Sequence, residues 1–263
     1  MMRSILTLVA LGFAGHFTAW AQEGYLSLEH PEAKVNLCTA TDHAANLSYL
    51  LPNAGSTQDC GASWAMAPAY ALDAAYKRKG QDVQVSVQQI VSCDVTDGGC
   101  QGGDPLTAAQ YMLQRPLAAD KAYPYTSGGG DTGVCRTQSH YPYQLGEYHL
   151  LPGADNTTTG RTLPSVATMK QALCAHGPLV SAANAENFSH YPGGVVSGDC
   201  PGDYRNLSAT VLIVGWDDTK EAWLVDPFFG SQFGLNGYMW ISYGTPKQHT
   251  CGIGFEAMWL APK

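Results

Sequence analysis

Ser63 carries the side chain that could most readily act as a nucleophile, a hydroxyl group. It lies near the start of an alanine-rich apolar run over residues 62–76. A serine hydroxyl is neutral, so it becomes an effective nucleophile only when a neighbouring base takes its proton. The eight histidines are scattered and show no defensible spacing to Ser63. Serine is also a preferred helix N-cap, a role that needs no chemistry. Both interpretations stay open, and the missing base favours the cap.

The eight cysteines are the other reactive side chains. They contain no Cys-x2-Cys pair, so we expect neither a metal site nor a cofactor. An even number in a secreted chain is typical of disulfides in an oxidising compartment. They lie at Cys38, Cys60, Cys93, Cys100, Cys135, Cys174, Cys200 and Cys251.

Residues 1–21 have the pattern of a signal peptide. Arg3 gives a positive start, residues 5–14 are mostly apolar, and Ala19-Trp20-Ala21 is a small-x-small cleavage site. The apolar run is too short to span a bilayer. We therefore predict a secreted protein, in the extracellular space, a periplasm or the endolysosomal lumen. Sequons that could carry glycans begin at Asn46, Asn156, Asn187 and Asn206.

The charge of the chain excludes one class of partner. The net charge is −8 and only 14% of the residues are charged. Nucleic-acid binding requires a basic stripe, which this composition does not supply. The composition also fits an anionic membrane surface poorly, and it indicates a compact fold rather than disorder.

Four helices are expected in the first two thirds of the chain. Residues 62–76 predict a buried helix, with Pro68 near its first turn and Gly80 at its end. Further helices are predicted over 87–93, 105–114 and 166–175, and Ser86 and Ser165 are the expected N-caps of the first and third of these.

The sequence pattern changes from helix-forming to strand-forming segments after Gly177. Short β-rich segments cover 178–183, 210–216, 222–225 and 237–242, separated by Gly or Asp turns. Helices followed by strands predict an α+β fold with a helical lobe beside a β lobe.

Several blocks of the sequence resemble the papain family of cysteine peptidases, which includes the cathepsins. Residues 60–65 read Cys-Gly-Ala-Ser-Trp-Ala, where the family has Cys-Gly-Ser-Cys-Trp-Ala. Residues 85–93 and 99–103 are similar to the Leu-Ser-x-Gln helix and the Gly-Cys-x-Gly-Gly wall. Residues 188–195 are similar to the aromatic stretch ahead of the family's catalytic histidine, and residues 209–216 and 223–238 are similar to the blocks that carry the histidine and the asparagine.

The resemblance implies a two-lobe papain-like fold, with a helical lobe, a β-barrel-like lobe and a cleft between them. It places the peptidase-like domain at 49–263, after an N-terminal arm over 22–48 that lacks an inhibitory propeptide. It also implies the disulfides Cys60–Cys100, Cys93–Cys135 and Cys200–Cys251. Cys38 and Cys174 remain, and we pair them only because they are the two cysteines left after the other three pairs are assigned.

The catalytic positions depart from the family pattern. Ser63 stands at the cysteine position, Ala209 at the histidine position and Pro227 at the asparagine position. The family relies on a Cys–His pair oriented by Asn, and neither Ala209 nor Pro227 has a polar side chain. Gln58 is the candidate oxyanion-hole residue, one residue closer to Ser63 than in the family.

The remaining cleft candidates follow from the same alignment. His190 is the best candidate for a relocated base, and it could equally be an ordinary loop histidine. The other expected cleft or substrate-binding residues are Trp64, Gly102, Gly103, Ser208 and Phe229, which takes the place of a shielding tryptophan.

Three functions are compatible with this pattern. The favoured one is a secreted, catalytically inactive papain-fold protein that binds a peptide or protein at the former active-site cleft. The second is a hydrolase that uses Ser63 with a relocated histidine. The third is a structural extracellular protein. None of them requires a cofactor, nucleic acid or a membrane span.

Overall fold

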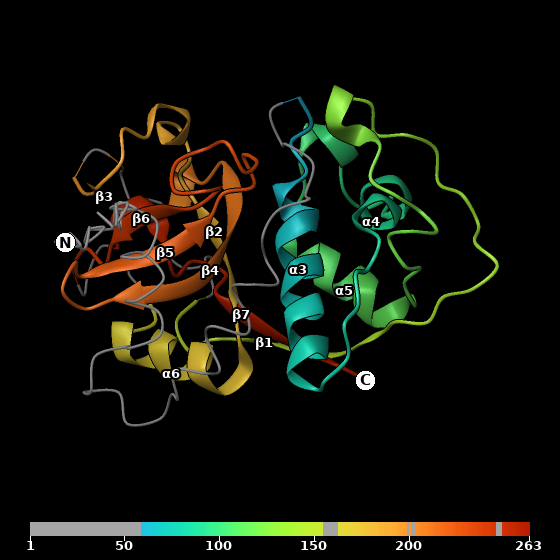
Figure 1. Cartoon of the computed structure of the whole chain (residues 1–263), viewed down its shortest axis with the longest axis horizontal. Helices are drawn as coiled ribbons and strands as arrows, with labels where there is room; N and C mark the ends of the chain where they lie inside the picture. Colours follow the sequence, from blue (N-terminus) through green and yellow to red (C-terminus); the bar gives the residue numbers. More distant parts are fainter. Residues whose placement is uncertain (1–58, 155–162, 199, 201–203, 246–248) are drawn as a thin grey trace, which may run out of the picture.

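The computed structural model describes residues 59–154, 163–198, 200, 204–245 and 249–263. Figure 1 shows two halves, one built from α3, α4 and α5 and the other from a β-sheet with α6. This segregation confirms the predicted α+β fold. None of the helices in the described part of the chain has the length and hydropathy that a bilayer span requires. The predicted signal peptide and Gln58 lie outside the described residues.

Helix α3, Ser63–Arg78, is the element of the helical half that lies next to the sheet (Figure 1). It is buried on nearly every side, as its alanine-rich sequence predicts, because small side chains let other elements approach its backbone. Gly80 ends it as expected: Gly80 has φ +78°, its N–H donates to Lys77, and the Gln81 N–H donates to Tyr76. Pro68 lies inside the helix, not in its first turn as predicted.

Three shorter helices begin at side-chain caps. In α4, Val87–Cys93, the Ser86 side chain accepts a hydrogen bond from the Gln89 N–H. In α6, Val166–His176, Ser165 does the same for Thr168. Both caps were predicted. Helix α5, Pro105–Gln114, begins at Asp104, whose carboxylate accepts from the Leu106 N–H.

The strands form one seven-stranded sheet in the order β1-β7-β2-β4-β5-β6-β3. In the described residues this sheet is open rather than a closed barrel. Neighbouring strands are antiparallel, except for the parallel pair β3 and β6. Strands β2, β4, β5 and β6 coincide with predicted segments, whereas β1, β3 and β7 were not predicted. Their bounds are β1 Leu145–Leu150, β2 Leu179–Ala183, β3 Val195–Val196, β4 Ala209–Asp217, β5 Ala222–Asp226, β6 Met239–Ser242 and β7 Met258–Pro262.

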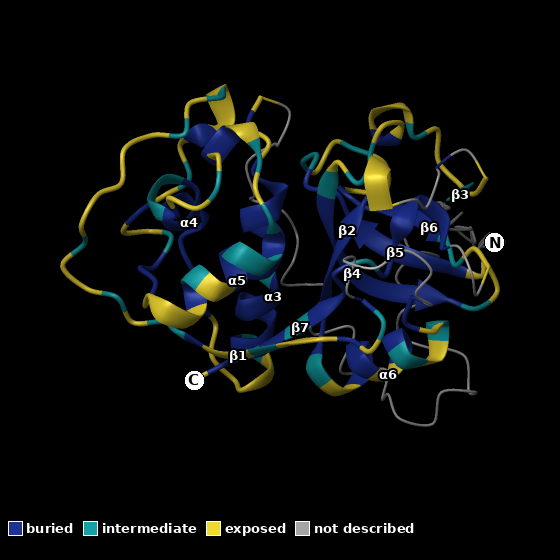
Figure 2. Cartoon of the chain, turned by 180° about the vertical axis from the view of Figure 1, so that it is seen from behind, coloured by how far each residue is buried: buried dark blue, intermediate teal, exposed yellow. Residues whose placement is uncertain are grey.

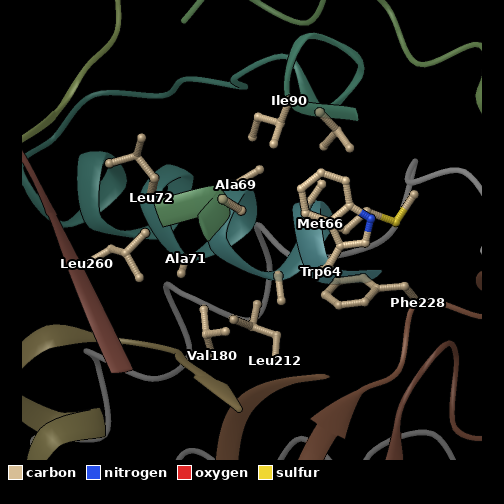
Figure 3. Packing of buried hydrophobic residues seen from close by; sticks show 14 of the residues in the cluster. Trp64, Met66, Ala69, Ala71, Leu72, Ile90, Val180, Leu212, Phe228 and Leu260 are labelled. Atoms are coloured by element: carbon tan, nitrogen blue, oxygen red, sulfur yellow. The ribbon is translucent and has the colours of Figure 1, made fainter. Parts of the chain in front are cut away.

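The hydrophobic core fixes the position of α3 against both halves. Ala71 of α3 points toward Val180 and Leu212 of the sheet, while Ile90 of α4 lies on the opposite side of the helix (Figure 3). Figure 2 shows α3 and the central strands β2, β4 and β5 buried, whereas exposed residues concentrate in the outer loops and in β1. A helix held on both sides cannot slide or rotate freely, so its N-terminal residue Ser63 has a fixed place.

Three disulfides add covalent bonds to this packing. They join Cys60 to Cys100, Cys93 to Cys135, and Cys200 to Cys251, which are the pairs that the family resemblance implied. Cys174 is disulfide-bonded as well, and the partner proposed for it from the sequence, Cys38, lies outside the described residues. Disulfides of this kind fit an oxidising compartment.

Candidate functional site

A cleft of about 350 Å³ lies between the N-terminus of α3 and the start of β4. It contains Ser63 and Ala209, the first residues of these two elements. The structure therefore brings together two of the three substituted catalytic positions. The residues that line the cleft are Gly61, Ser63, Trp64, Gly102, Gly103, Asp104, Pro105, Ala182, Tyr204, Leu207, Ser208, Ala209, Thr210 and Glu256.

The Ser63 hydroxyl binds the opposite half of the molecule. Its oxygen accepts a hydrogen bond from the backbone N–H of Thr210, with an Oγ–N distance of 3.1 Å. Ser63 is the first helical residue, Ala62 holds the capping position, and no side chain caps the helix. The N-cap interpretation of Ser63 was therefore wrong. The hydroxyl forms its hydrogen bond with a strand residue 147 positions away in the chain rather than with its own helix.

Ala209 and Pro227 contribute no polar group. Ala209 pairs with Ala183 across β4 and β2, and its small side chain faces the cleft half-buried. Pro227 follows β5, is buried, and is not among the cleft-lining residues.

Beside Pro227, Asp226 is a buried carboxyl group. Its Oδ1 accepts a hydrogen bond from the Phe228 N–H at 2.7 Å. Burial raises the pKa of Asp226 to about 7, against the opposing effect of that hydrogen bond. Asp226 is likewise absent from the lining of the cleft.

The structure does not bring His190 to Ser63. His190 ends the short 3-10 helix Phe188–His190, is exposed, and has its Nδ1 3.2 Å from the Ser189 hydroxyl. No described histidine lines the cleft, and none of the described residues accepts a hydrogen bond from Ser63. The relocated-base hypothesis for His190 was therefore wrong, because its loop holds the imidazole at the surface.

Of two other predicted cleft residues, Ser208 and Phe229, only the first lies in the cleft. Ser208 lines the cleft, and its exposed hydroxyl accepts a hydrogen bond from the Ala185 N–H at 3.1 Å. Phe229 does not line it. The Phe229 ring instead packs edge-on against Phe233, with 5.1 Å between the ring centroids.

The opposite wall of the cleft contains Trp64, Gly102 and Gly103, as predicted. The Trp64 indole N–H donates to the Gly99 carbonyl at 3.0 Å, which fixes the ring. A Cβ on Gly103 would come within 2.5 Å of that ring, so only glycine fits there without displacement. Gly102 has φ +108°, a Cβ there would meet no atom within 4 Å, and its N–H and carbonyl are hydrogen-bonded to Gly99 and Gly98.

Sequence reasoning missed several cleft residues, among them Glu256 and Tyr204. Glu256 precedes β7, is 5% exposed and has φ +53°. Together with Asp104 it makes the charged residues of the described lining acidic. Tyr204 belongs to the short 3-10 helix Tyr204–Asn206 and is 39% exposed at the cleft. Neither belongs to a motif, so no sequence signal points to either residue.

His249 is buried, and its imidazole stabilises the fold. The His249 Nδ1–H donates to the Ile253 carbonyl at 2.7 Å, and burial lowers the pKa of the imidazole. His249 lines a separate hollow of about 770 Å³ beside Tyr243 and does not line the cleft. Within the described ranges, no group of three or more His, Cys, Asp or Glu side chains could hold a metal ion.

Sequence comparison identifies relatives over most of the chain. Human cathepsin O is 30% identical over 203 residues, which cover 74% of this chain and 58% of the human protein. Mouse cathepsin O is 28% identical over 246 residues, covering 92% of this chain and 73% of the mouse protein. Cysteine proteinase 2 of Leishmania pifanoi is 32% identical over 193 residues, covering 70% and 40%. The match thus spans less than two thirds of the human protein.

Solved structures share the fold. The cysteine protease CMS1MS2 of Carica candamarcensis, solved in complex with E-64, superposes with a TM-score of 0.66 at 21% identity, covering 80% of this chain and 92% of that chain. The ragweed pollen allergen Amb a 11, a cysteine protease solved in its proform, gives a TM-score of 0.67 at 24% identity, with coverages of 82% and 63%. These likenesses confirm the predicted papain-like architecture.

The family model described as papain family cysteine protease matches residues 37–260. That range contains both halves of the fold, the three described disulfides and every residue that lines the cleft. The chain belongs to the papain family of cysteine proteases.

Proposed function

We propose that this chain is a secreted papain-family protein that does not hydrolyse peptides and that binds a peptide or protein segment in its cleft. The observation that carries the proposal is the hydrogen bond from the Thr210 N–H to the Ser63 hydroxyl. The residue at the nucleophile position is used as a contact between α3 and β4. It has no hydrogen bond to a base among the described residues.

The chemistry of the neighbouring positions supports the loss of catalysis. A hydroxyl is far less ionised than a thiol, so it depends on a base even more than the family's cysteine does. Ala209 supplies a methyl group where an imidazole would be needed, and Pro227 has no polar side chain to orient one. The carboxylates in the cleft, Asp104 and Glu256, make no hydrogen bond with Ser63.

The shape of the cleft supports retained binding. Its volume of about 350 Å³ is that of an ordinary ligand site. The Gly102 N–H and carbonyl are hydrogen-bonded within their own loop, but no described residue bonds the N–H or the carbonyl of Gly103, which the fixed Trp64 ring supports. An extended peptide can form main-chain hydrogen bonds with such a wall. The signal-peptide pattern and the disulfides support a secreted location.

The first experiment tests for residual catalysis. Purified protein is treated with a serine-reactive fluorophosphonate and, separately, with a fluorogenic peptide library. We expect no labelling and no cleavage, and no cleavage from Ser63→Cys either, because the thiol would still lack a base. Labelling that disappears in Ser63→Ala, or turnover by Ser63→Cys, would reinstate a hydrolase.

The second experiment tests for binding. The protein is expressed in its secreted form, and bound peptides are eluted and identified by mass spectrometry. Ala209→Phe, which fills the cleft, is the matched control. The proposal predicts peptides that are recovered from the wild type and depleted from the filled variant. Equal recovery from both proteins would show that the cleft is not the binding site.

A further inference from the structure

The hydrogen-bonding capacity of Ser63 is only half used. A serine hydroxyl offers one proton and two acceptor lone pairs. The Thr210 N–H occupies a lone pair, and no described residue accepts the Ser63 proton. The residue is nevertheless 9% exposed, so the hydroxyl lies deep in the floor of the cleft. A deeply placed donor without an acceptor is unfavourable unless a ligand or water accepts its proton.

The helix behind Ser63 adds to this donor. Ser63 is the first residue of α3, a helix of 16 residues. The amides of the first turn have no acceptor within the helix, and the helix dipole places partial positive charge at this end. The floor of the cleft therefore favours an oxygen atom of the occupant.

The surroundings select a neutral oxygen over an anion. Asp104 and Glu256 are the charged residues among the described lining, and both are acidic. A carboxylate group of a ligand would be repelled by the Asp104 carboxylate, which caps α5 at the cleft. The lining also contains the apolar side chains of Ala182, Leu207 and Ala209 together with the polar Ser208, and Ala209 stands where the family carries an imidazole.

We infer that the floor of the cleft binds a neutral amide carbonyl of the occupant through the Ser63 hydroxyl, with an apolar side chain of the occupant in the space over Ala209. The inference rests on the proposed function, because it requires a peptide in the cleft. The inferred peptide is uncharged where it contacts Ser63, and it has an apolar residue next to the bound carbonyl.

The probe is a library of N-acetylated, C-amidated hexapeptides, selected on immobilised wild-type protein and ranked by fluorescence anisotropy. Selected peptides should share an apolar residue. Ser63→Ala should weaken the tightest peptide roughly three- to tenfold, the effect of one neutral hydrogen bond. Ala209→Phe should weaken it at least as much, whereas Phe at the exposed Ala175 on α6 should have no effect.

A thioamide scan tests the carbonyl directly, and the loss it causes with the wild type needs no variant of the protein. Each amide oxygen of the tightest peptide is replaced by sulfur, one position at a time, since sulfur is the weaker acceptor. We expect one position to lose affinity for the wild type and to lose none for Ser63→Ala, because the two changes remove the same contact.

The outcomes separate the inference from the proposed function. Peptides that bind the wild type with no loss from Ser63→Ala, Ala209→Phe or any thioamide would overturn the inference and leave peptide binding intact. Selection of peptides with an anionic group at the Ser63-dependent position would also overturn it. A wild-type protein that retains no peptide would overturn both.

Discussion

Gly103 lies directly against the indole ring of Trp64, and a Cβ at position 103 would come within 2.5 Å of that ring and within 2.7 Å of the Asp97 carboxylate. We expect Gly103→Ala to destabilise the fold by about 1–3 kcal/mol, the usual cost of overpacking a buried contact. Urea unfolding measures this. Gly129→Ala is the control, since a Cβ there meets no atom within 4 Å. Equal stability of the two variants would contradict the contact.

Removing the Ser63 hydroxyl should also lower stability. Ser63→Ala leaves the buried Thr210 N–H without its acceptor, which costs about 1–3 kcal/mol. The control is Ser208→Ala, where the lost acceptor of Ala185 is at an exposed position and water can replace it. Chemical denaturation of both variants gives the comparison. A loss from Ser208→Ala as large as that from Ser63→Ala would show that burial of the Thr210 contact has no special effect.

The buried carboxyl of Asp226 predicts a pH dependence of stability. Burial raises the pKa of Asp226 in the fold to about 7, whereas the ordinary pKa of an aspartate side chain is 3.8. Between these values the unfolded chain loses a proton that the folded chain keeps, so the free energy of unfolding falls as the pH rises from about 4 to about 7. Asp226→Asn, which keeps an acceptor for the Phe228 N–H, should flatten this decline.

The measurement for Asp226 is urea unfolding at several pH values across that window. Other buried acidic groups contribute to the same decline, so only the difference between wild type and Asp226→Asn is assigned to this carboxyl. Asp82→Asn, at an exposed carboxylate that pairs with Lys77, is the control. Parallel curves for the wild type and Asp226→Asn would contradict the prediction.

The imidazole of His176 predicts an opposite pH effect. It stacks on Trp259 with 3.7 Å between ring centroids, while His149 stacks on the same indole at 4.3 Å. Burial lowers the pKa of His176, and the charges of Arg78 and His149 lower it further, against Glu147. Because the folded pKa lies below the unfolded one, this group costs stability as the pH falls below about 6.5.

A direct titration checks the His176 prediction. Two-dimensional NMR of the imidazole resonances should give His176 a pKa below its ordinary value, and Arg78→Met should raise it. Arg78 also donates hydrogen bonds to the Cys174 and Ala175 carbonyls at the end of α6. Lys77→Met, which removes a positive charge from the same end of α3, is the control. An unchanged pKa in Arg78→Met would exclude the electrostatic explanation.

The features predicted correctly from the sequence are those set by local chemistry. Ser86 and Ser165 each bond an amide three residues ahead, and Gly80 takes a backbone conformation that other residues adopt only with strain. These interactions involve neighbours in the chain, so residue type and spacing suffice to predict them. The family blocks extended this to the lobes and the disulfides.

The errors concern contacts between distant segments. Strand β1 is stabilised by pairing with β7, more than a hundred residues later, and its exposed residues show no alternating pattern. Ser63 is a residue type that often caps helices, but its hydroxyl oxygen accepts a hydrogen bond from the Thr210 N–H instead. Glu256 reaches the cleft because the chain turns sharply just before β7. None of these relations can be deduced from the residue types at one position.

Strand β7 lies inside the sheet, between β1 and β2, although it is the last described strand in the chain. It also supports α3, since the Lys79 ammonium donates to the Pro262 carbonyl. During synthesis, β1 and β2 therefore leave the ribosome with unpaired edges and wait for residues 258–262 before the sheet can close. A premature stop codon only a few residues upstream of β7 would remove an internal strand, and the truncated product would expose two aggregation-prone strand edges.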